Sequence, residues 1–144
     1  MADESAYVDT SILGAYYCPE PLSAPAENAL RQLKTPVISI LSEVEFCSLI
    51  SKKYRLDELR QRQAKEILDL FSSHVAEGFY RRISLNTEHF IKARQLVSSM
   101  DSSLRTLDAL HLAVALSERL ALVTADREFA RAGKRHKANI LLIR

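Results

Sequence analysis

The sequence predicts a three-layer α/β domain built on a parallel sheet of four to five strands. Two observations support this prediction: short, continuous apolar runs recur along the chain, and helix-like stretches separate them. Runs such as Val37–Ile40 and Ala121–Thr124 are typical of parallel strands that are buried on both faces. Because strands alternate with helices, the helices are expected to cover both faces of the sheet. At 144 residues the chain has the length of one domain, so we expect residues 1–144 to form a single unit.

The first half of the chain contains two predicted strands and four predicted helices. Tyr7–Val8 begins the sheet, and Val37–Ile40 is its second strand. Prolines set the helix limits here, since Pro19 and Pro21 end the first helix and Pro36 ends the second. The helices are predicted over Thr10–Cys18, Ser23–Leu33, Ser42–Tyr54 and Leu56–Ala76, of which the last two form a helical hairpin.

The second half is predicted to add three strands, at Phe79–Ile83, Ala121–Thr124 and Ile140–Ile143. Thr87–Ser99 has the apolar spacing of an amphipathic helix. Leu104–Leu120 is apolar on nearly all sides, which predicts a helix in the interior of the domain.

Composition excludes several classes of protein. With 47% hydrophobic and 26% charged residues the chain is an ordinary globular one, and no apolar run approaches the ~20 residues that span a bilayer. The acidic start lacks the features of a secretory signal, so we expect a cytoplasmic protein with no membrane association. Three glycines exclude a glycine-rich phosphate loop. Cys18 and Cys47 both lie in apolar helical stretches and are predicted to be buried free thiols.

Positive charge is concentrated in one segment. The net charge of +2 is too small to establish nucleic-acid binding by itself. Between positions 127 and 137, however, five basic residues accompany the single acid Glu128. We therefore predict that a polyanion such as RNA binds there, through Arg127, Arg131, Lys134 and Arg135.

Four acids, Asp9, Glu45, Asp108 and Asp126, lie at or near the starts of predicted helices, where strand-like runs give way to helix-like ones. In an open parallel sheet these positions meet at one edge, where ligands usually bind. Carboxylates that crowd together disfavour one another's ionisation, and a divalent cation is their natural partner. The pattern therefore predicts a site for a hard metal ion.

Each acid also has a purely structural interpretation. Asp9 and Asp126 are suitable helix N-caps, and Ser42 with Glu45 fits a capping box. Asp108 lies in a first turn, where the helix dipole favours negative charge. Asp108 is the weakest case for this interpretation, because its helix is the most apolar of the chain and a lone buried carboxylate is costly.

Four blocks of sequence resemble the PIN-domain ribonucleases, and within them the VapC-type toxins of bacterial and archaeal toxin–antitoxin pairs. They are Tyr7–Ser11, Ser39–Phe46, Leu104–Ala113 and Val123–Phe129, and each contains one of the four acids. Helical periodicity does not choose between Glu43 and Glu45, but the resemblance places the second acid at Glu45. Ser42 departs from the family's common threonine and retains its hydroxyl.

The resemblance implies a twisted parallel sheet flanked by helices and a site for Mg²⁺ or Mn²⁺ that serves RNA cleavage. Asp9 and Asp126 are then the primary ligands, and Asp108 and Glu45 bind directly or through water. The resemblance also implies a homodimer that pairs through helices. A separate small antitoxin protein is expected to lay an extended segment in the groove beside the acids.

Neighbouring side chains have predicted supporting roles. A hydroxyl from Thr10, Ser11 or Thr124 is placed to orient a ligand or a metal-bound water. His111 follows Asp108 by three residues on the same helical face, which suggests a metal ligand. Carboxylate and water suit Mg²⁺ better than imidazole does, so a packing role for His111 is favoured.

The sequence thus predicts a Mg²⁺-dependent endoribonuclease toxin of a toxin–antitoxin pair. Two alternatives stay open: a catalytically idle PIN-like module that binds RNA or protein, and a PIN nuclease outside a toxin–antitoxin system. The homodimer is also predicted from the residues themselves, because the helical hairpin carries more apolar residues than its packing requires. These residues are Leu49, Leu56, Leu59 and Phe71.

Overall fold

The computed structural model describes residues 5–100 and 103–144. Within them, five strands form one sheet in the order β3-β2-β1-β4-β5, and every neighbouring pair is parallel. The strands are β1 (Ser5–Val8), β2 (Thr35–Ser39), β3 (Arg81–Ile83), β4 (Ala121–Thr124) and β5 (Ile140–Leu142). The predicted α/β fold with a parallel sheet is confirmed.

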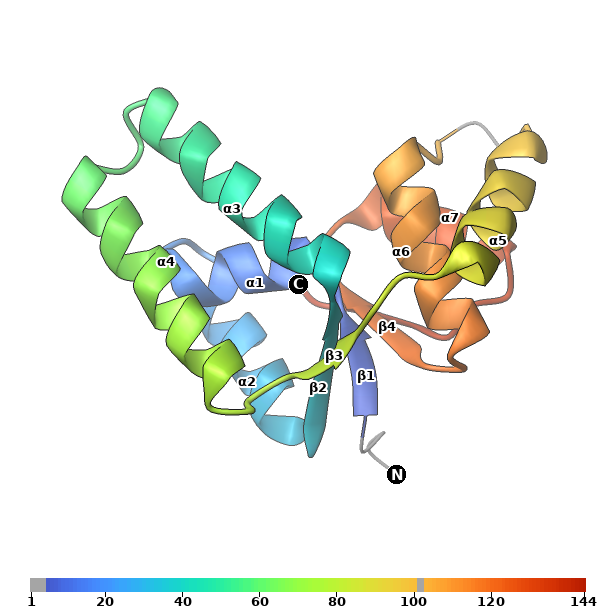
Figure 1. Cartoon of the computed structure of the whole chain (residues 1–144), viewed down its shortest axis with the longest axis horizontal. Helices are drawn as coiled ribbons and strands as arrows, with labels where there is room; N and C mark the ends of the chain where they lie inside the picture. The colour runs from blue at the N-terminus through green and yellow to red at the C-terminus, as the bar shows by residue number, and fades with distance from the viewer. Residues whose placement is uncertain (1–4, 101–102) are drawn as a thin grey trace.

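Helices cover both faces of this sheet (Figure 1). In the described residues they are α1 (Thr10–Tyr17), α2 (Ser23–Gln32), α3 (Ile40–Arg55), α4 (Gln61–Ala76), α5 (Thr87–Ser98), α6 (Thr106–Ser117) and α7 (Arg127–Arg135). Side chains alternate along β1, so that Ala6 and Val8 join a core with Phe46 of α3, whereas Tyr7 joins one with Leu112 of α6. Helices α1 to α4 therefore form one outer layer, and α5 to α7 form the other.

The strand order reverses between β1 and β4, and we call the position outside the carboxyl ends of these two strands the crevice. The chain builds β2 and β3 outward on one side of β1, and then returns to place β4 and β5 on the other side. At such a reversal the carboxyl ends of the two central strands leave an opening in which α/β proteins bind ligands. Asp9 directly follows β1, and Asp126 lies just beyond β4, so both acids lie at this opening.

Three predicted helix starts are wrong, and one of them is that of α6, which begins at Thr106 instead of Leu104. Helix α3 begins at Ile40 instead of Ser42, because Ser39 caps it by accepting a hydrogen bond from the Ser42 backbone. Helix α4 begins at Gln61 instead of Leu56, because the chain that leaves α3 turns at a left-handed residue, Asp57, with φ 59°. The Glu58 amide then bonds the Lys53 carbonyl at 2.9 Å, as in a Schellman motif. The left-handed position of this motif is usually a glycine, so the aspartate at position 57 does not reveal from the sequence that the helix ends here.

Other burial predictions have mixed outcomes. Residues Ala109–Ala115 of α6 are all buried, which confirms an interior helix. Cys18 is buried as expected, but the prediction for Cys47 is wrong, because its thiol is exposed on α3. Phe71 is one of the four residues predicted to be excess apolar surface of the hairpin, and this prediction is wrong, because Phe71 is buried and packs against Phe46 with ring centroids 4.6 Å apart. No helix in the described residues is both long and apolar enough to cross a membrane.

Candidate metal centre

Asp9 is held in a fixed position at the end of β1. It is buried, and its Oδ2 accepts hydrogen bonds from Ser11 Oγ at 2.7 Å and Thr124 Oγ1 at 2.8 Å. Asp9 occupies the N-cap position of α1, but its side chain makes no capping bond, so the structural interpretation of this acid is wrong. No hydrogen bond found among the described residues uses Oδ1, which leaves this oxygen for a cation.

Glu45 reaches the same place from the second turn of α3. Its Oε1 accepts a hydrogen bond from His111 Nε2 at 2.9 Å. Burial raises the pKa of Glu45, but the bond and charge of His111 and the nearby Thr10 hydroxyl outweigh it and lower that pKa. The capping box assigned to Ser42 and Glu45 is wrong, because the box joins Ser39 and Ser42. Glu45 is therefore free of a capping role and remains ionised.

A buried chain of polar groups supports Glu45. His111 is 1% exposed, and its Nδ1 lies 2.6 Å from the Tyr7 hydroxyl, which in turn lies 2.8 Å from Ser39 Oγ. A carboxylate only accepts, so Nε2 of His111 donates to Glu45, and Nδ1 bonds the Tyr7 hydroxyl. Burial and nearby negative charges raise the pKa of Tyr7 to about 12, which keeps its hydroxyl protonated. The packing role favoured for His111 is thus incomplete, because this side chain contacts a candidate ligand.

Asp9, Glu45 and His111 form the tightest group in this region. Each offers one ligand atom, and these atoms all lie within 4.8 Å of one another. Two further acids lie outside this group. Asp126 is exposed, and its Oδ1 accepts from the Phe129 amide at 3.1 Å, which confirms its role as an N-cap of α7. Its second carboxylate oxygen is not used by that cap.

The charges of the other three acids affect the pKa of Asp108. Asp108 lies in the first turn of α6, as predicted. Burial raises its pKa, and the charges of Asp9, Asp126 and Glu45 raise it further, although the Arg105 backbone lowers it. Asp108 is thus close enough to the other three acids to be repelled by their charges. A cation would reverse the sign of that interaction.

The donor set suits a hard divalent cation. Carboxylate oxygens are the ligands that Mg²⁺ prefers, and the imidazole of His111 would be better accepted by Mn²⁺ than by Mg²⁺. The Thr10 hydroxyl is buried and has no hydrogen bond of ordinary geometry within residues 5–100 and 103–144, although it lies close enough to Glu45 to lower the pKa of that residue. An unsatisfied buried hydroxyl beside carboxylates is a further reason to expect a hydrated ion.

A stability measurement can test the repulsion at Asp108. Its folded-state pKa is raised above 3.8, so its contribution to stability is complete below that value and is lost as the pH rises through the raised value. In EDTA, the wild type should therefore lose more thermal stability between pH 4 and pH 7 than Asp108→Asn does. Asp69→Asn, at an exposed position of α4, should behave like the wild type. Equal losses in all three proteins would contradict the repulsion.

The predicted RNA-binding residues separate into two groups. Arg127, Arg131 and Lys134 line a cavity of about 250 Å³ that Arg144 completes. Arg135 lies outside it, and its guanidinium donates a hydrogen bond to Ser103 at 3.0 Å. The signal for Arg144 was absent from the sequence, since β5 separates this residue from α7.

Comparison with known proteins places this chain in a family. The model of the PIN domain family matches residues 6–135. The chain belongs to the PIN domain family. A search of curated proteins finds no match to this PIN domain.

Solved structures share the fold of this PIN domain. A chain of VapBC2 from Rickettsia felis, bound to a DNA fragment from their promoter, is 19% identical with a TM-score of 0.68, over 96% of this chain and 98% of that one. VapC20 of Mycobacterium tuberculosis, a sarcin-ricin loop cleaving toxin, is 17% identical with a TM-score of 0.70, over 89% and 95%. A toxin–antitoxin complex from Klebsiella pneumoniae is 21% identical with a TM-score of 0.62, over 87% and 90%. At these identities the likeness shows the fold alone.

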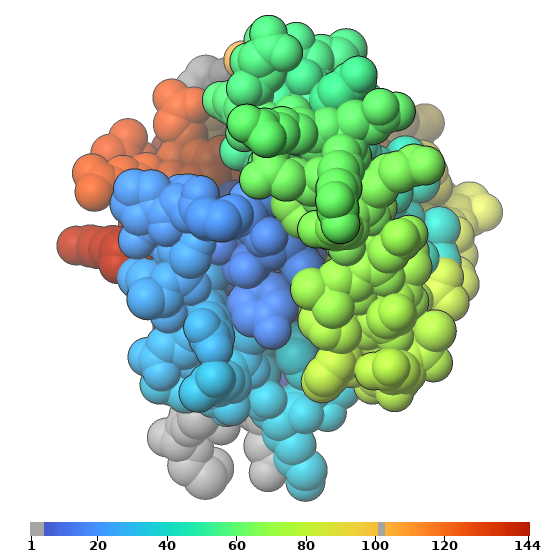
Figure 2. Space-filling view, turned by 90° about the vertical axis from the view of Figure 1, so that its left-hand side faces the viewer, coloured from blue at the N-terminus to red at the C-terminus, as the bar shows by residue number. Residues whose placement is uncertain are grey.

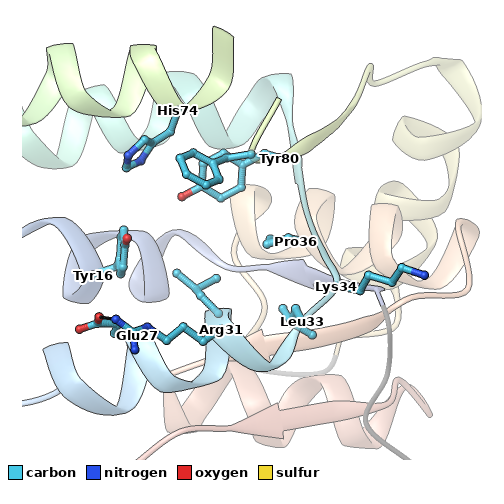
Figure 3. A pocket seen from close by; sticks show the side chains of 10 residues that line it. Tyr16, Glu27, Arg31, Leu33, Lys34, Pro36, His74 and Tyr80 are labelled. Carbon is cyan, nitrogen blue, oxygen red and sulfur yellow. Dashed lines mark hydrogen bonds and ion pairs between the residues drawn. The ribbon is translucent and has the colours of Figure 1, made fainter. Parts of the chain in front are cut away.

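A second cavity, of about 340 Å³, lies away from the acids (Figure 3). Lys34 and Pro36 line it where β2 begins, and Tyr80 lines it just before β3, so it lies at the amino ends of these strands. On the molecular surface α2 and α4 form two ridges with α1 between them (Figure 2). This cavity therefore does not belong to the acidic site.

Proposed function

We propose that this PIN domain is a metal-dependent endoribonuclease that acts as the toxin of a toxin–antitoxin pair. The observation that carries the proposal is the group formed by Asp9, Glu45 and His111 near the end of β1, whose ligand atoms lie within 4.8 Å of one another. Burial raises the pKa of Asp108, and the charges of Asp9, Asp126 and Glu45 raise it further, which supports a place for Asp108 and Asp126 beside this group. The family and the neighbouring toxin structures support the proposal.

In this proposal the residues have distinct tasks. Asp9 and Asp126 would hold the cation directly, and Glu45 and Asp108 would hold it directly or through water. Ser11 and Thr124 orient Asp9 through the two hydrogen bonds to its Oδ2. A bound Mg²⁺ or Mn²⁺ supplies an acidified water and positive charge against the phosphodiester. His111 keeps the Glu45 carboxylate ionised and pointed at the crevice.

A cleavage assay tests the proposed activity. The purified chain should cut RNA in Mg²⁺ or Mn²⁺ and leave it intact in EDTA, and single-stranded DNA should be cut far more slowly. Binding of RNA with no cleavage under any divalent cation would instead support a catalytically idle module.

The proposed partner is a small antitoxin. The Klebsiella pneumoniae neighbour is a toxin–antitoxin complex, and VapBC2 is another fold neighbour. We expect a basic side chain of the antitoxin to pair with the acids and displace the cation. Expression of this chain alone should arrest growth, and co-expression with an adjacent small reading frame should restore it. Growth arrest by an Asp9→Asn variant, or no adjacent frame at all, would contradict the toxin assignment.

The proposed assembly is a homodimer formed through the α3–α4 hairpin. Phe71 no longer supports it, but Val44 is 66% exposed and Leu56 is 60% exposed on the hairpin, and exposed apolar surface of this kind marks interfaces. Light scattering should give the mass of a dimer at micromolar concentration, and Leu56→Glu should shift it toward a monomer. A monomeric mass for the wild type would contradict the dimer.

A further inference from the structure

The cavity between α7 and β5 gathers four positive charges in one place. Arg127, Arg131 and Lys134 recur at one face of α7, at the spacing of successive helical turns, and Arg144 closes the cavity from beyond β5. We call this cavity the α7–β5 cation pocket. Its remaining walls are the small apolar side chains Ala130 and Leu142.

Its positive charges have no acidic partner among the described residues. The ion pairs found in positions 5–100 and 103–144 use none of the four basic side chains. Four like charges that converge without a counter-ion repel one another, and an anion relieves that repulsion. Arginine pairs with phosphate through two parallel N–H donors, which makes a phosphate group the fitting anion.

The pocket is one strand away from the acids. Leu142 of β5 is the register partner of Thr124 of β4, and the Ile143 amide donates to the Thr124 carbonyl at 2.9 Å. Thr124 also donates its side-chain hydrogen bond to Asp9. Neighbouring strands lie about 4.8 Å apart. Asp126 directly precedes Arg127 at the start of α7, so pocket and acids share one edge of the sheet.

The lining identifies which part of a nucleic acid fits. No aromatic side chain lines the pocket, so a base has no surface on which to stack. At about 250 Å³ the pocket is also smaller than the ~300 Å³ or more that is usual for a whole small-molecule ligand. A single phosphate group, with one or two negative charges, matches the charge and is small enough to enter together with water.

We infer that the α7–β5 cation pocket binds one phosphate of the RNA strand, next to the phosphodiester that lies at the acids. That the bound strand is RNA rests on the proposed ribonuclease function. The RNA-binding residues in this inference are Arg127, Arg131, Lys134 and Arg144, so Arg144 is included and the predicted Arg135 is not. A phosphate held there fixes the register of the strand and carries no sequence information, so the pocket serves RNA of any sequence.

Binding in EDTA tests the pocket without requiring cleavage. Arg131→Gln and Arg144→Gln should each weaken the binding of a short single-stranded RNA roughly tenfold and reduce the salt slope by about 0.7, the value for one lost phosphate contact. Lys65→Gln is the control, because Lys65 is exposed and belongs to α4. Figure 1 shows α4 on the opposite side of the molecule from α7. Wild-type affinity and slope in both pocket variants, or an equal loss in the control, would overturn the inference.

Replacing single RNA phosphates by uncharged groups shows which phosphate the pocket binds. Oligoribonucleotides with a single methylphosphonate should bind the wild type roughly tenfold more weakly at one flanking position, and that penalty should vanish in Arg131→Gln. A penalty of equal size in both proteins at every position would overturn the inference. If only inorganic phosphate competes for the pocket, with no position-specific penalty, the pocket is a free-anion site and the RNA assignment fails. A protein that passes these binding tests but cuts no RNA in Mg²⁺ refutes the proposed activity and leaves the pocket in place.

Discussion

Asp9→Asn is expected to lower the rate of RNA cleavage by about three orders of magnitude while the protein stays folded. The substitution keeps the shape of the side chain and removes a ligand charge. Loss of metal stabilisation is worth several kcal/mol, and about 1.4 kcal/mol corresponds to a tenfold change in rate. Single-turnover cleavage at saturating Mg²⁺ measures the effect, and circular dichroism checks the fold.

The matched control for this variant is Asp69→Asn. It makes the same chemical change at an exposed position of α4, outside the acidic site. Its cleavage rate should equal that of the wild type. Full activity in Asp9→Asn at saturating Mg²⁺ would remove Asp9 from the proposed ligand set.

His111→Ala is expected to lower cleavage by roughly 10- to 100-fold, the usual effect of losing a residue that orients a ligand. The substitution removes the hydrogen bond to Glu45 Oε1 and leaves the Tyr7 hydroxyl without its nitrogen partner. Tyr7→Phe should have a smaller effect on activity, because it leaves the contact between His111 and Glu45 in place.

His89→Ala separates this effect from a general loss of stability. His89 is also 1% exposed, and it pairs with Glu118 at 3.3 Å, on α5 and away from the acids. Both histidine variants should unfold at lower temperature. Only His111→Ala should lose activity per folded molecule, so equal activities in the two variants would contradict the positioning role.

Local patterns explain why most of the fold and the four acids could be predicted. The apolar runs at Val37–Ile38 and Leu122–Val123 mark buried strands without any knowledge of their neighbours. An acid that follows such a strand is then placed at the carboxyl edge of the sheet, as Asp9 is.

Features that depend on packing between distant segments could not be predicted in the same way. His111 meets Glu45 only because α3 and α6 approach each other on opposite sides of the crevice, across 66 positions of sequence. Arg144 joins Arg131 only because β5 adds to β4 at the edge of the sheet. Phe71 shares the apolar face of α4 with Ile67 and Val75, but the sequence does not show that Phe46 and Tyr80 are the residues that pack against it.

The most direct test of the central claim is the position of a bound cation. A crystal soaked in Mn²⁺ should give an anomalous scattering peak at the crevice between β1 and β4, bound by a carboxylate oxygen of Asp9 and by at least one of Glu45, Asp108 and Asp126. The same soak of Asp9→Asn should give a much weaker peak. No peak at this crevice in the wild type, or an equal peak in the variant, would contradict the proposal that these acids form one metal centre.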